Sequence, residues 1–146
     1  MPSLAHLSFS GLRRSVVPAL RARYRGTAVR LVVHGAKPDI WLAANLDNPF
    51  RDWVDDDTRG GNAACKAYAT AVRAVDRLPP SGDGRPADAE TILRRLVDTL
   101  NDIDQKYHFI DTLRQEDAGE AFVALAARAG VEAPEAEQWF DEWRDF

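Results

Sequence analysis

Side chains that could act as nucleophiles or general bases are few and scattered along this chain. The three histidines, His6, His34 and His108, lie far apart in the sequence, and the single cysteine, Cys65, stands in an alanine-rich stretch. No Gly-x-Ser-x-Gly turn and no paired Cys–His signature accompanies them. We therefore predict that the histidines are surface or structural residues and that Cys65 is a small buried hydrophobe.

Carboxylates near the C-terminal end could support metal chemistry, because acidic side chains on neighbouring helices can hold Mg²⁺. The pattern is Glu116-Asp117-x-x-Glu120, followed by Glu142-x-x-Asp145. Over these last 31 residues it is similar to the carboxylate pattern of the all-α nucleotide pyrophosphohydrolases. The resemblance implies that acids on two helices bind magnesium, which holds a triphosphate and activates water. The chain departs from that pattern in having Asp117 where a glutamate is expected.

A run of aspartates surrounds a tryptophan in a stretch that we expect to be irregular. Its residues are Asp52, Trp53, Asp55, Asp56 and Asp57. The stretch is not an EF-hand calcium loop, because Arg59 occupies a ligand position and Lys66 stands where the bidentate glutamate belongs. An aromatic residue flanked by charge is common at interface hot spots, so these five residues are candidates for contact with a basic partner surface. The alternative is that Trp53 packs inward and the aspartates are solvated.

Charge is distributed unevenly along the chain. Residues 1–38 carry seven basic residues and no acid, which gives +7, and the remaining residues carry 12 bases and 23 acids, which gives −11 and a net charge of −4. The arginines Arg13, Arg14, Arg21, Arg23 and Arg25 are therefore candidates for contact with nucleic-acid phosphates. The competing interpretation is internal, since these arginines could pair with acids of the same fold.

The elements that must position these residues follow from the spacing of apolar side chains. Residues 4–9 alternate weakly and residues 27–34 are rich in Val and Leu, which predicts two strands. Ser10 could cap a helix that kinks or begins near Pro18 and ends at Gly26. After a turn at residues 35–39, residues 40–46 are predicted to return as a strand antiparallel to the one before it.

The longest periodic segment is residues 87–107, whose apolar side chains recur with the period of a helix. Further helices are predicted over residues 62–78 with Asn62 as cap, from a capping box at Thr112 to Gly130, and from Pro134 onward. Residues 79–86 are expected to form a surface loop. The sequence thus predicts one α+β domain over residues 1–146. A small N-terminal antiparallel sheet with one helix (1–46) is followed by a bundle of about four helices (62–146).

Composition narrows the function class. No apolar run approaches the roughly 20 residues of a membrane span, and the N-terminal residues lack a secretory apolar segment. We expect a cytoplasmic protein that does not bind a membrane and needs no cofactor. The main hypothesis is a non-enzymatic inhibitor, like an immunity protein or antitoxin, that neutralises a toxin or enzyme with a basic surface. The alternative is a nucleic-acid-associated protein that uses the arginine-rich segment, and the third is the magnesium-dependent pyrophosphohydrolase.

Overall fold

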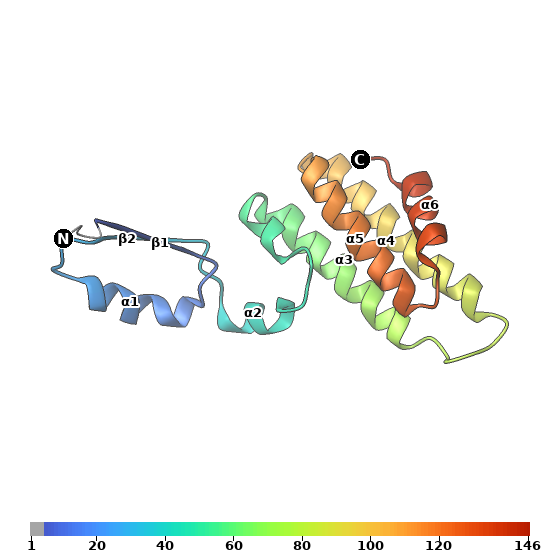
Figure 1. The fold of residues 1–146 in the computed structure, drawn as a ribbon, viewed down its shortest axis with the longest axis horizontal. Coiled ribbons are helices and arrows are strands. Elements are labelled where there is room, and N and C mark those ends of the chain that lie inside the picture. Colours follow the sequence, from blue (N-terminus) through green and yellow to red (C-terminus); the bar gives the residue numbers. More distant parts are fainter. Residues whose placement is uncertain (1–4) are drawn as a thin grey trace. The chain divides into compact units, whose positions relative to one another are not determined.

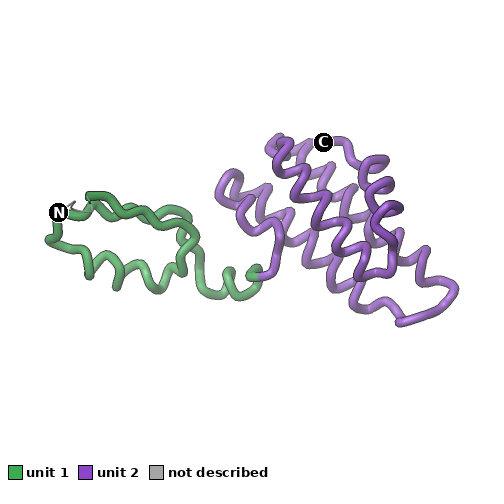
Figure 2. The backbone as a smooth tube through the Cα atoms, in the orientation of Figure 1, with its two compact units in different colours: residues 1–46 green, residues 47–146 purple. Residues whose placement is uncertain are grey.

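The computed structural model describes residues 5–146, and the chain divides into two compact units, residues 1–46 and 47–146 (Figures 1 and 2). The fold is mixed α+β and mostly helical, with 65% of the structure in helices. The first unit carries seven basic residues and one acid, and the second carries 12 basic residues and 22 acids. We call them the basic unit and the helical unit. That all 146 residues form one domain stays a prediction.

The basic unit is built on a parallel pair of strands. β1 (His6–Ser10) and β2 (Arg30–His34) pair in register, with Phe9 opposite Val33. The short 3-10 helix η1 (Arg14–Val16) and α1 (Val17–Tyr24) connect them. Pro18 lies in the first turn of α1, where a backbone N–H has no partner within the helix, so proline costs no hydrogen bond there. Gly26 turns the chain at φ +76°. Residue 4 of the predicted first strand lies outside the described residues.

Two predictions for the basic unit are wrong, and the first error explains the second. Most of residues 40–46 belong to helix α2 (Asp39–Asn45), not to a strand, and the sheet is parallel rather than antiparallel. Without a third strand β2 pairs with β1, and the crossover through α1 makes the two strands run in the same direction. Asp39 in the first turn and the alanines that follow favour the helix.

The helical unit begins with the 3-10 helix η2 (Arg51–Asp55). Its long elements are α3 (Thr58–Asp76), α4 (Arg85–Tyr107), α5 (Thr112–Arg128) and α6 (Ala133–Trp143). α3 packs along α4, and α5 packs against α6. The buried interior includes Phe50, Leu93, Leu100, Phe122 and Leu125. All four helices lie where apolar periodicity predicts them, while their description as a bundle stays a prediction.

Aspartates cap two of these helices, and each of the two starts earlier than predicted. The Asp57 carboxylate accepts a 2.6 Å hydrogen bond from the backbone N–H of Gly60, so α3 begins at Thr58 rather than after Asn62. Asp111 likewise accepts a 3.0 Å bond from the backbone N–H of Arg114. Asparagine, threonine and aspartate are all good N-cap residues, so composition alone does not choose among neighbours.

The first turn of α3 lies directly against η2. A Cβ atom at Gly61 would overlap the backbone nitrogen of Val54, and one at Gly60 would overlap the ring of Phe109. Both glycines are buried. Glycine therefore allows the backbones of α3 and η2 to approach more closely than any side chain would permit.

Candidate protein-interaction surface

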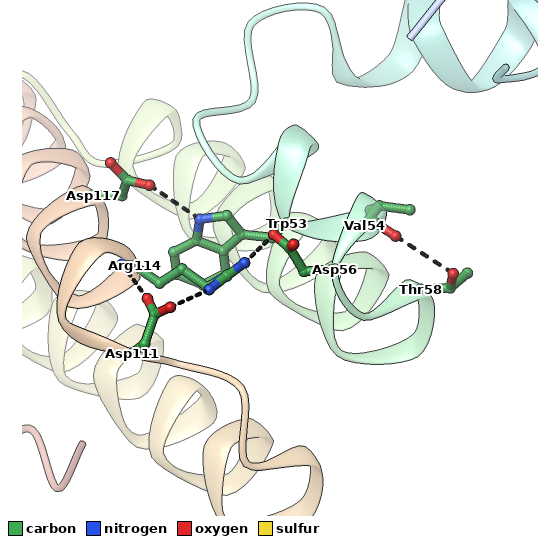
Figure 3. Close-up of polar contacts among 7 residues, drawn as sticks. All are labelled: Trp53, Val54, Asp56, Thr58, Asp111, Arg114 and Asp117. Carbon is green, nitrogen blue, oxygen red and sulfur yellow. Dashed lines mark hydrogen bonds and ion pairs between the residues drawn. The ribbon is translucent and has the colours of Figure 1, made fainter. Parts of the chain in front are cut away.

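The tryptophan of the Asp-rich stretch points into the helical unit (Figure 3). Trp53 is 3% exposed, and its ring stacks on Phe50 with 4.2 Å between ring centroids. Phe109 meets the indole edge-on at 5.8 Å, and the indole N–H donates a hydrogen bond to Asp117 Oδ2 at 3.3 Å. The inward-packing alternative is therefore confirmed for Trp53, and its ring is not an exposed anchor for a partner.

Arg114 ties the end of η2 to the start of α5. Its guanidinium forms an ion pair with Asp56 and a second one with Asp111 at 2.7 Å (Figure 3). Burial alone would lower the pKa of Arg114, but its hydrogen bonds to the two carboxylates raise that pKa above its ordinary value. The backbone N–H of Arg114 is the main cause that holds the pKa of Asp111 below its usual range. Asp56 is thus a structural residue in this arrangement.

The remaining aspartates of the stretch have separate positions. Asp57 caps α3, whereas Asp52 and Asp55 are exposed on η2. Asp52 lies 3.7 Å from the guanidinium of Arg51. Contact of these acids with a partner stays a prediction, now without the tryptophan at its centre.

The structure does not gather the acids of the magnesium hypothesis. Asp117 bonds the indole of Trp53, and Glu142 accepts a 2.8 Å bond from Gln138. Glu116, Glu120 and Asp145 are exposed. Within residues 5–146, no three His, Cys, Asp or Glu side chains stand together as potential metal ligands. The ligand set that the resemblance implied is therefore not assembled by these side chains.

Cys65 is buried, as predicted. Its side chain lies in α3, where burial first and the charge of Asp52 second raise its pKa to about 11. A thiol with so high a pKa stays protonated near neutral pH and is a weak nucleophile. His6, His34 and His108 are exposed, in agreement with the surface role expected of them.

The arginines of the nucleic-acid hypothesis are all exposed on the basic unit. Arg13 and Arg14 lie at η1, Arg21 and Arg23 lie on α1, and Arg25 follows it. Across residues 5–146, no salt bridge joins any of these five side chains to a carboxylate. The described residues therefore do not show the internal pairing, and this positive charge faces outward.

A groove between α5 and α6 combines an apolar floor with an acidic border. It has a volume of about 530 Å³. The floor is formed by Gly119, Val123, Ala124, Ala127 and Phe140, and the border by Glu120, Glu137 and Asp141. We call these eight residues the acidic groove.

Two carboxylates of the acidic groove form no ion pair with a basic side chain of the described residues. Asp141 pairs with Arg144 at 3.1 Å, but Glu120 and Glu137 are exposed and form no ion pair within the described part of the chain. A Cβ at Gly119 would lie 3.3 Å from Phe140, so glycine at this position keeps the two helices close. Such a surface can accept a partner that is apolar at its centre and cationic around it.

Sequence reasoning missed the acidic groove, although a signal was present. One side of α5, which includes Ala118, Phe122 and Leu125, is buried in the core. Val123, Ala124 and Ala127 are apolar residues outside that stripe. A helix with more apolar surface than one core face needs is a candidate for a second contact.

Comparison with known proteins identifies no relative. No family model matches this chain, and neither a curated protein nor a solved structure does. Among the helices of residues 5–146, none is both long and apolar enough to cross a membrane. We therefore infer function from the geometry and charge of the chain itself.

Proposed function

We propose that this chain is a cytoplasmic, non-enzymatic interaction protein that neutralises a toxin or enzyme by binding its basic surface. The observation that best supports the proposal is the acidic groove, where an apolar floor lies beside the unpaired carboxylates of Glu120 and Glu137. An apolar centre with a charged rim is the usual composition of a protein interface. The helical unit, with 22 acids against 12 basic residues, would also attract a basic partner over a distance.

The floor of the acidic groove suggests the shape of the contact. Gly119, Ala124 and Ala127 have little or no side chain, so the backbone of a docking helix or loop could come close to α5. Lysine or arginine side chains flanking that segment would then reach Glu120 and Glu137. Desolvating these pairs only partly, at the rim, keeps the electrostatic cost low and the association fast.

Neutralising the border of the acidic groove is expected to weaken the binding of a cationic ligand. The probe is a synthetic amphipathic helix of leucine and lysine, and its binding to the full chain is measured by fluorescence anisotropy at low and moderate salt. Glu120→Gln with Glu137→Gln should raise Kd by about tenfold, which corresponds to about 1.4 kcal/mol. The salt dependence should also become weaker, because two screened attractions are removed.

The matched control removes the same charge elsewhere. Asp88→Asn with Glu90→Gln neutralises two exposed acids of α4 that are not part of the acidic groove. We expect Kd for this control to stay within about twofold of the wild type. Equal losses in the two double variants would mean that net charge alone attracts the peptide, which would remove the groove from the proposal.

The second candidate function is nucleic-acid binding by the basic unit, and the unpaired arginines favour it. If they contact phosphates, Arg13→Gln with Arg14→Gln should weaken binding to a short labelled RNA or DNA duplex. The slope of log K against log salt should fall by about one for each lost contact. Arg77→Gln with Arg94→Gln, which removes the same charge from the helical unit, is the control. A wild-type chain that binds neither duplex at low salt would exclude this function.

A further inference from the structure

A second groove lies between α3 and α4, and it has the opposite border. Its volume is about 340 Å³. Its apolar lining is formed by Ala63, Ala67, Ala71 and Ala74 of α3 and by Ile92, Leu96 and Ile103 of α4, and Thr70 and Thr99 also line it. Lys66 and Arg95 stand at its edges, one from each helix. We call these eleven residues the cationic groove.

The cations continue beyond the cationic groove along α3. Arg59, Lys66 and Arg73 follow one another at seven-residue spacing, so they lie on one side of the helix, and all three are exposed. The sole acid within α3 is Asp76, which pairs with Arg128 at 2.6 Å. In the described residues, no salt bridge joins Arg59, Lys66, Arg73 or Arg95 to a carboxylate. A strongly acidic unit thus has one basic ridge beside an open apolar surface.

The acidic groove and the cationic groove are complementary in chemistry. Each has an apolar floor rich in small side chains, and one is bordered by cations while the other is bordered by carboxylates. They share no residue and belong to different helix pairs, α3 with α4 and α5 with α6. One molecule can therefore present both surfaces at the same time.

We propose that the cationic groove of one chain receives the α5–α6 face of a second copy. Lys66 and Arg73 of one copy would meet Glu120 and Glu137 of the other, so that the charged borders of the two grooves pair across the contact. The contact joins two different surfaces, so it is heterologous, and each added copy leaves a new groove open at either end. The proposal rests on the proposed function in that it uses the same acidic groove, which a second copy would occupy in competition with a basic partner.

Sedimentation velocity of the full chain from about 5 to about 500 µM tests this association. At low salt the average mass should rise with concentration to at least that of a dimer. At about 0.5 M salt it should return to that of the monomer, because the charge pairs are screened. A chain that remains monomeric throughout this range at low salt would overturn the proposal.

Charge reversal identifies the two surfaces. Lys66→Glu with Arg73→Glu makes the α3 side of the cationic groove acidic, and Glu120→Lys with Glu137→Lys makes the border of the acidic groove basic. In each double variant alone, like charges would meet at these positions, so each should be monomeric. Mixing the two variants in equal amounts should restore association, because every contact again joins opposite charges. Failure of the mixture to associate would contradict the pairing of these grooves. Arg21→Glu with Arg23→Glu, an equal charge change in the basic unit, should leave self-association unchanged.

The same variants separate this proposal from the proposed function. The Lys66→Glu, Arg73→Glu variant keeps Glu120 and Glu137 and loses the competing second copy, so it should bind the leucine–lysine helix at least as tightly as the wild type while losing self-association. Peptide binding without self-association in the wild type would leave the proposed function standing and refute the head-to-tail contact. Self-association of the wild type, together with no binding of the peptide to the monomeric Lys66→Glu, Arg73→Glu variant, would refute the proposed partner class alone.

Discussion

Replacing Trp53 with alanine is expected to lower the free energy of unfolding of the helical unit by about 3–5 kcal/mol. The indole is 3% exposed and lies between Phe50 and Phe109, so its removal opens a cavity where η2 meets the later helices. It also removes the hydrogen bond to Asp117, although this exposed carboxylate can bond water instead. Urea denaturation of the full chain, followed by the helical circular dichroism signal, measures the change.

Two variants accompany the alanine substitution. Trp53→Phe retains a ring against Phe50 and should lose clearly less stability than Trp53→Ala. Asp52→Asn, at an exposed neighbour on η2, should stay within about 0.5 kcal/mol of the wild type. A Trp53→Ala chain as stable as the wild type, yet unable to bind a basic partner, would show that the indole is an interface residue after all.

The second large effect is expected at Gly61. Alanine here places a Cβ against the backbone nitrogen of Val54 and the carbonyl carbon of Trp53. Backbone cannot rotate away as a long side chain can, so α3 must shift from η2. We expect a loss of about 1–3 kcal/mol in the same denaturation experiment.

Gly84→Ala is the matched control for Gly61→Ala. Gly84 precedes α4 at φ −80°, and the nearest atom to an added Cβ is the Asp88 carboxylate, 3.9 Å away. Its stability should change by no more than about 0.5 kcal/mol. If both glycine variants unfolded at the wild-type urea concentration, α3 and η2 would not be in the close contact described.

Long periodic segments could be predicted from the sequence, and short ones could not. The apolar side chains of residues 87–107 repeat over several turns, and α4 occupies Arg85–Tyr107. Residues 40–46 are too few to distinguish the two periods, and Ile40, placed in a predicted strand, is 82% exposed on α2. The strand direction depended on that assignment, because the parallel pairing follows from which strand is available to β2.

The sequence could not predict that the Trp53 side chain packs inward, because the residues that it contacts are distant in the sequence. Asp117, which accepts the indole hydrogen bond, is 64 residues away, and Phe109 follows α4. Local composition shows an aromatic residue among acids and does not show which side the later helices will cover. The two grooves were missed for the same reason, since a groove is the surface that neighbouring helices leave open.

Burial is divided very unequally between the two units. Among residues 5–46, Val17 is the single buried hydrophobic side chain, whereas the others lie in the helical unit. Mutational tolerance should follow this division: most substitutions in the basic unit change side chains that are at least partly exposed, while many in the helical unit open a cavity. Selection for stability alone would therefore let the basic unit drift in sequence. If its exposed arginines were nevertheless retained during evolution, selection for binding to another molecule would be the reason.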